Sequence, residues 1–312
     1  MTLPSSQRHR TWEGIVRAAT AAVAAAVLLL VLWMGWILLV TAWPAIQTFG
    51  LGFLLSSDWN PVRGLFGGLP FIYGTLVTSF TALLLATPIG LGAAIALSEL
   101  LPYRWRLALL PFVELLAAVP SVVYGLWGIF VLVPFLRTYV EPPLQKYFGF
   151  LPLFQGPILG LGYLAAGVIL AIMILPTITS ISASVLQAVP SSQKEAILAL
   201  GATRWEAIRM VIVPYARSGI IGAIMLGLGR AIGETMAVTM VIGNAHRISV
   251  SLFAPGNTIA SVIANEFAEA VSQLHSTSLI YLGLILFVIT LLLNMLARWL
   301  VARTRIGKEA YS

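Results

Sequence analysis

Long apolar runs separated by short polar stretches dominate the chain. A run of about 20 apolar residues is long enough to cross the roughly 30 Å hydrocarbon core of a bilayer as a helix. Such runs occur at about 18–42, 71–97, 107–136, 156–179, 213–243 and 277–301. The pattern predicts an all-α polytopic membrane protein with six transmembrane helices.

Composition and charge agree with a membrane protein and indicate its orientation. The sequence is 59% hydrophobic and only 9% charged, which excludes a single water-soluble domain. Thirteen Lys and Arg residues flank the spans on the side of the two termini, and four lie on the other side. The positive-inside rule therefore places both ends in the cytoplasm. The same scatter of basic residues argues against a nucleic-acid partner, because no basic patch with interleaved aromatics is present.

The apolar runs also divide the chain into three parts. We expect a cytoplasmic segment, an anchor helix and, at 44–70, an outer interfacial loop, which together make up residues 1–70. A core of five transmembrane helices follows at 71–301. A cytoplasmic tail at 302–312 completes the chain. The first run is too long for the apolar region of a signal peptide, so we interpret it as an uncleaved anchor.

The inner loop at 183–213 has the start and stop signals of two short helices. Ser192 and Glu195 have the spacing of a capping box, and Gly201 is placed to end the helix that it would begin. Thr203 and Glu206 repeat the capping box. The loop is therefore predicted to be a helix, a bend and a second helix.

This inner loop is unusually apolar for a cytoplasmic connection. Its large apolar residues are Ile197, Leu198, Leu200, Trp205 and Ile208. Two interpretations are open: the residues form a docking surface for a partner, or they pack back onto the protein's own helices.

The fifth run carries two charges, Arg230 and Glu234, near its midpoint. A continuous helix would place both on one face with small residues at 219, 223 and 227, and their spacing of four would let them pair. Gly229 and Gly233 add a GxxxG motif that permits close helix packing. Because ions are costly in the bilayer, two interpretations remain: a structural salt bridge, or groups on a polar path or gate.

Other polar residues give weaker signals. Glu114 lies in the third run, where it can reach the membrane interface or act inside the bilayer. The histidines His9, His246 and His275 are far apart in sequence, so we expect no metal site, and the chain has no cysteine. No G-x-x-x-x-G-K-[ST] motif occurs, so the sequence shows no P-loop nucleotide site of its own.

The inner loop resembles the EAA signature of ABC importer permeases. In KEAILALGATRWEAIRMVIVP, Glu195, Ala196 and Gly201 match the signature, whereas Ile197 replaces its third-position alanine. Four further segments resemble the PstC-type permeases of phosphate-specific ABC importers. These are SSDWNPV at 56–62, LPFIYGTLVTS at 69–79, AAVPSVVYGLWG at 117–128 and GLGRAIGETMAV at 227–238.

The resemblance implies a type I ABC importer permease in the bacterial cytoplasmic membrane, without a bound cofactor. Its partners would be a second, PstA-like permease, two PstB-like ATPase subunits and an extracytoplasmic PstS-like phosphate-binding protein. It assigns substrate passage to Arg230 and Glu234. ATPase docking falls to Glu195, Ala196, Gly201 and their neighbours, among which we include Ala202 and Trp205.

Three alternatives stay open from sequence alone. A permease for another oxyanion would share the EAA loop. An ion-coupled transporter or channel would explain the two intramembrane charges but would leave the apolar inner loop without a role. A membrane enzyme is disfavoured, because the intramembrane ionisable residues are one Arg and one or two Glu.

Overall fold

The computed structural model describes the backbone of residues 5–306, and the side chains of these residues apart from 5–12, 14–15 and 304–306. Six helices in this part of the chain are long and apolar enough to cross a membrane. They span Val16–Phe49, Leu69–Leu100, Ser121–Phe148, Tyr163–Gln187, Arg204–Ile232 and Gln273–Arg303. The prediction of six transmembrane helices is therefore confirmed.

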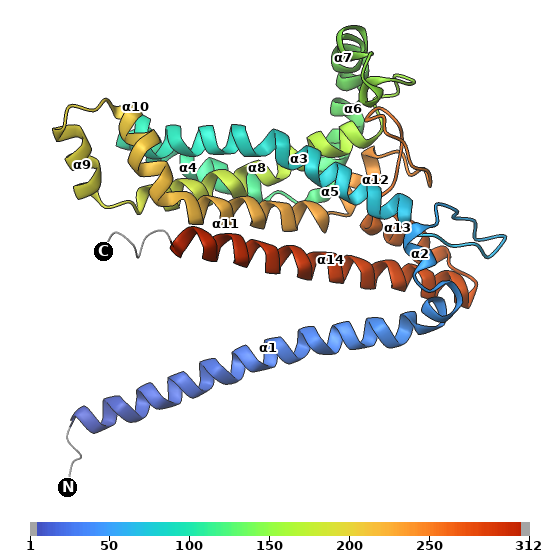
Figure 1. The fold of residues 1–312 in the computed structure, drawn as a ribbon, viewed down its shortest axis with the longest axis horizontal. Helices are drawn as coiled ribbons and strands as arrows, with labels where there is room; N and C mark the ends of the chain where they lie inside the picture. The colour runs from blue at the N-terminus through green and yellow to red at the C-terminus, as the bar shows by residue number, and fades with distance from the viewer. Residues whose placement is uncertain (1–4, 307–312) are drawn as a thin grey trace.

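The long helices lie roughly along one direction, with the inner loop at one end of the bundle (Figure 1). They are α1 (Ser5–Phe49), α3 (Leu69–Ile95), α8 (Tyr163–Gln187), α11 (Val213–Ile232) and α14 (Gln273–Ile306). The described ends of α1 and α14 lie at the same end as α9 (Ser191–Ala199) and α10 (Arg204–Ala207). The short helices α2 (Gly52–Leu55), α7 (Glu141–Phe148) and α13 (Ile259–Glu266) lie at the opposite end.

Helix α8 forms the centre of the bundle, and about two thirds of the residues in its most apolar part are buried. It is hydrophobic all round, which is typical of a helix enclosed by others. Glycines on its neighbours let their backbones approach: a Cβ at Gly90 of α3 or at Gly227 of α11 would meet Ile178. Helix α1 packs on α14 and, through Phe49, on Phe53 and Phe66, and leaves most of its other large apolar side chains exposed. This arrangement places α3 and α11 against the same central helix.

The predicted third span at 107–136 is wrong in detail, because the helix breaks inside it. Helix α4 (Tyr103–Ala118) ends at Val119, whose backbone is extended with ψ 129°. The next residue is Pro120, and a proline disfavours the helical conformation of the residue before it. A second helix begins at Ser121 with α5 (Ser121–Trp127) and continues through α6 (Val133–Phe135) into α7.

The fifth span is also interrupted. A continuous helix runs from Arg204 to Ile232 and ends at Gly233, after which α12 (Met236–Val241) begins. The predicted helix over 213–243 is therefore too long at its outer end. As a result, Glu234 lies between two helices and not within one.

The inner loop has the predicted helix, bend and helix. Gly201 follows α9 with φ 89°, in the left-handed region that favours glycine. The amide of Ala202 bonds to the carbonyl of Ile197 and that of Gly201 to Leu198, which is the Schellman pattern. The capping box of Thr203 and Glu206 is confirmed. That of Ser192 is wrong, because α9 already begins at Ser191 and has no side-chain cap.

The outer loop expected at 44–70 is packed into a small core. Helix α1 extends to Phe49, and the side chains of Phe53, Phe66 and Phe71 are buried. They contact residues of α13 and α14. The loop therefore joins the first and last transmembrane helices at the outer end.

Candidate translocation site and coupling loop

Arg230 lies in the last turn of α11 and is half-buried. Its guanidinium donates to the hydroxyl of Thr177 on α8 at 3.4 Å and to the carbonyl of Ala117 on α4 at 3.3 Å. Both hydrogen bonds are longer than the usual range of about 2.7 to 3.2 Å. The arginine thus reaches across two neighbouring helices but is only loosely held.

The two helix breaks meet close to this arginine. Ala117 is in the last turn of α4, where carbonyl oxygens lack helical partners and form the negative end of the helix dipole. The neighbouring carbonyl of Leu116 accepts from the hydroxyl of Tyr124 on α5 at 2.8 Å. Beyond the break, Gly125 of α5 packs against α12, because a Cβ at Gly125 would meet Met240 of that helix. The breaks therefore leave α4, α5, α11 and α12 around one cationic group.

The predicted pairing of Arg230 with Glu234 is wrong. Ion pairs within 4.0 Å in the described part of the chain are Lys194–Glu99, His246–Glu266 and His275–Glu266. The helix ends before Glu234, so the spacing of four no longer sets the geometry. Instead, the Glu234 carboxylate accepts the amide of Ala237 in the first turn of α12, at 3.3 Å. No described carboxylate thus neutralises Arg230 through direct contact.

The small-residue face of α11 packs against the central helix. Gly219, Ala223 and Gly227 lie against α8, since a Cβ at 219 would meet Val185 and one at 227 would meet Ile178. This face therefore serves helix packing within the chain. By contrast, Gly229 and Gly233 of the GxxxG motif are exposed, and neither packs against another helix of the described chain.

A cavity of about 470 Å³ lies beside Arg230, between α8, α11 and α14. Its polar lining includes Thr177 and Arg230 together with Thr290 and Asn294 of α14. The other lining residues are Met225, Leu226, Leu228, Gly229, Ile232 and Leu293. An anion in this cavity would therefore contact the Arg230 guanidinium and neutral hydrogen-bonding side chains, and the rest of the cavity lining is apolar.

The third-span carboxylate, Glu114, is exposed on α4, one turn before Ala117. Because the helix breaks just beyond it, Glu114 does not lie near the end of a full-length span as expected. The structure assigns it no hydrogen bond or ion pair within the described residues.

The inner loop at 183–213, which we name the coupling loop, presents most of its predicted docking residues to solvent. Glu195, Ala196, Gly201 and Trp205 are exposed, and Ala202 is half-buried. Leu200 is 88% exposed and Trp205 is 60% exposed, whereas Ile208 is buried in the core with α8 and α11. Both interpretations of the apolar loop thus hold for part of it: Ile208 packs back, and Leu198, Leu200 and Trp205 form an open surface.

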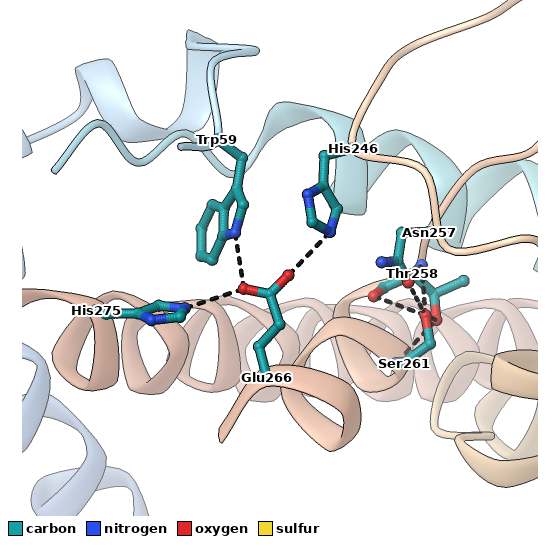
Figure 2. A network of polar contacts seen from close by, with 7 residues as sticks. All are labelled: Trp59, His246, Asn257, Thr258, Ser261, Glu266 and His275. Carbon is teal, nitrogen blue, oxygen red and sulfur yellow. Dashed lines mark hydrogen bonds and ion pairs between the residues drawn. The ribbon is translucent and has the colours of Figure 1, made fainter. Parts of the chain in front are cut away.

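A polar network at the end of the bundle opposite the inner loop was not predicted (Figure 2). Glu266, at the end of α13, accepts from the indole of Trp59 and contacts Nε2 of His246 and of His275, each at 2.9 Å. Because an ionised carboxylate only accepts hydrogen bonds, each Nε2 must carry the hydrogen. Trp59 in turn packs edge-on against Phe66 and Phe71. The network joins the first outer loop to the segments around α13 and α14.

The chemistry of Glu266 follows from these partners. Burial acts to raise the pKa of its carboxyl, but hydrogen bonds from His246, Trp59 and His275 outweigh burial and hold this pKa below its usual value. Among the described residues, no group of three or more His, Cys, Asp or Glu side chains is arranged to bind a metal ion. His9 lies where side chains are not described. In the sequence, Glu266 lies 207 residues from Trp59 and 9 residues from His275. Local sequence pattern therefore did not indicate that these side chains meet.

Comparisons with known proteins agree with this architecture. A family model described as "Binding-protein-dependent transport system inner membrane component" matches residues 86–306. A similar protein from Mesorhizobium japonicum, named phosphate transport system permease protein PstC, is 52% identical over 95% of this chain and 92% of its own length. A protein of the same name from Pasteurella multocida is 46% identical over 95% and 93%.

Solved structures show the same fold at low sequence identity. A chain of a bacterial alginate ABC transporter aligns with a TM-score of 0.60 at 16% identity, covering 94% of this chain and 98% of that one. A chain of the MetNI methionine ABC transporter in an inward-facing conformation aligns with a TM-score of 0.55 at 18% identity, covering 74% and 93%. This chain belongs to the family of inner-membrane components of binding-protein-dependent transport systems, together with the PstC permeases.

Proposed function

We propose that this chain is the permease subunit of an ATP-driven importer that moves inorganic phosphate across the cytoplasmic membrane. The observation that carries the proposal is Arg230, a half-buried cation at the meeting point of two broken helices. Relatives named as phosphate permeases, with 52% and 46% identity, support phosphate as the substrate. Transport sites in membrane proteins are commonly built at such helix breaks.

The geometry of Arg230 suits an anion that must bind and leave. A guanidinium has five N–H donors and is always charged. Here two hydrogen bonds of 3.3 and 3.4 Å to neutral oxygens hold it, and its charge is not cancelled by Glu234. An arriving phosphate can therefore replace Ala117 and Thr177 as acceptors and gain charge-assisted bonds. Glu234 accepts the amide of Ala237 in the first turn of α12, so it acts on the path by positioning this helix.

Energy for transport would come from a separate ATPase that docks on the coupling loop. The chain contains no P-loop motif, and its exposed surface of Glu195, Ala196, Leu200, Gly201 and Trp205 suits a protein partner. Ala202 lies at the edge of this surface. We therefore expect two PstB-like ATPase subunits, a PstA-like second permease and an extracytoplasmic PstS-like phosphate-binding protein. No cofactor is assigned to this chain.

The same proposal fixes the orientation in the membrane. The ends of α1 and α14 lie beside the coupling loop (Figure 1), and the flanking segments on that side are rich in Lys and Arg. We place this side in the cytoplasm. The Glu266 network then lies on the extracytoplasmic side.

The test is labelled phosphate uptake by proteoliposomes that contain this chain, its candidate partners and internal ATP. We expect uptake to require every partner and ATP. Excess unlabelled phosphate should suppress uptake of the label, whereas excess sulfate should not. Suppression by sulfate would assign a different oxyanion. Uptake by this chain alone, driven by an ion gradient without ATP, would contradict the proposal and favour an ion-coupled transporter.

A further inference from the structure

An ion pair ties the coupling loop to the transmembrane bundle. Lys194 Nζ on α9 lies 2.7 Å from Glu99 Oε1, and the two side chains are only 23% and 12% exposed. Helix α9 has no buried residue of its own. Glu99 lies in the π-helical turn η1 (Ala96–Leu100), which continues α3 at its inner end. The pair therefore adds a link from α9, which also contacts η5 (Ile208–Ile212), to the inner end of α3.

The helix that carries Glu99 is fixed at its other end to the outer segments. The hydroxyl of Tyr73 donates to the carbonyl of Ser249 at 2.9 Å, and the amide of Ile259 donates to the hydroxyl of Thr75 at 3.0 Å. Between them, Gly74 leaves room for the carbonyl of Asn257, because any Cβ there would overlap it. One helix from Leu69 to Leu100 thus has contacts to the 249–259 segment at one end and to α9 at the other.

Packing along this helix makes it a rigid connection. Its buried residues lie against α8 and α11 over most of its length, and close-packed interiors transmit displacement with little compression. The ion pair is also well placed to carry force. A short pair with little solvent exposure is weakly screened by salt, and removing one partner leaves the other charge uncompensated.

We propose that Glu99 and Lys194 form a strut that passes movement of α9 to α3 and from there to the outer 249–259 segment. The inference rests on the proposed function, because it takes α9 to be the helix that the ATPase moves. Glu99 and Lys194 are positioning residues in this scheme. They act on the path through α3 and not through contact with the transported ion.

The first test compares charge variants in the full reconstituted complex. We expect Lys194→Gln and Glu99→Gln to leave assembly and basal ATP hydrolysis intact. The stimulation of hydrolysis by phosphate-loaded binding protein should fall about 5- to 150-fold, the usual range of a coupling between sites. The exchanged variant Glu99→Lys/Lys194→Glu should recover most of the stimulation, and Lys194→Arg should retain it. Arg209→Gln, which removes an exposed cation of the same loop, is the matched control.

Two results would overturn the strut. One is normal stimulation in both single variants; the other is an exchanged variant that assembles but couples no better than the single variants. Loss of stimulation in the wild-type complex itself would count against the proposed function and not against the strut.

A second test needs no phosphate. The chain has no cysteine, so Leu100→Cys/Gln193→Cys, two exposed positions next to Glu99 and Lys194 that leave the ion pair intact, can be joined selectively by a bifunctional thiol reagent. A strut keeps its ends together, so the cross-linking yield should be the same with and without ATP. A yield that changes strongly with nucleotide would show that α9 and α3 move independently, which contradicts the proposal.

Discussion

Replacing Glu266 with glutamine tests how the outer segments are held together. The substitution keeps the shape of the side chain but removes the charge that accepts from Trp59, His246 and His275. Hydrogen bonds to a charged group contribute about 1.5 to 3 kcal/mol and neutral ones about 0.5 to 1.5 kcal/mol. With three partners and a carboxylate that is 15% exposed, we expect a loss of about 2 to 3 kcal/mol in the free energy of unfolding.

The assay is denaturant unfolding of the purified protein in detergent, with Glu269→Gln as the matched control. Glu269 is an exposed carboxylate in the short turn that follows α13, so its substitution should change stability by less than about 0.5 kcal/mol. Combining Glu266→Gln with Trp59→Phe, which keeps the ring packing, should give less than the sum of the two losses. Equal stability of Glu266→Gln and wild type, or full additivity with Trp59→Phe, would refute the account of this network.

The network also predicts a pH dependence. Because the pKa of Glu266 is lower in the folded protein than its ordinary value of about 4.3, the ionised carboxylate stabilises the fold. This contribution is fully present above the unfolded pKa and is lost as pH falls through the folded pKa. The stability difference between wild type and Glu266→Gln should therefore shrink on acidification. A constant difference between pH 7 and strongly acidic conditions would contradict this assignment.

Two further substitutions test the inner loop and the bundle. Gly201→Asp should uncouple ATP hydrolysis from uptake, because a side chain at φ 89° strains the bend between α9 and α10; normal coupling would contradict this role. Gly227→Leu should lower stability by about 1 to 3 kcal/mol through overpacking against Ile178, whereas Gly222→Leu, with open space around it, should not. Equal thermal stability of these two variants in detergent would refute the packing of α11 on α8.

The sequence predicted the features that depend on local pattern. Hydrophobic run length located the six spans, and the glycine and capping box of the inner loop predicted its bend at Gly201 and the start of α10 at Thr203. These predictions succeed because each uses residues that are neighbours in sequence.

The failures concern where helices stop and what lies across from them. Periodicity continued the fifth helix through Gly233, so Glu234 was expected one turn above Arg230. Its carboxylate instead accepts the amide of Ala237 at the start of α12. The small face of α11 suited both a passage and a helix contact, and only the position of α8 decides between them. The partners of Glu266 come from segments far apart in the chain. Local pattern carries no signal for such contacts.

The most direct test of the central claim is phosphate uptake by the complete complex that carries Arg230→Ala. A unit charge at about 4 Å contributes between about 1 kcal/mol in water and 4 kcal/mol near a protein surface. For the half-buried Arg230 we therefore expect uptake to fall roughly 10- to 1,000-fold. Arg230→Lys should lose less, and Arg217→Ala, an exposed cation on the same helix, should transport normally. Wild-type uptake by an assembled Arg230→Ala complex would contradict the account.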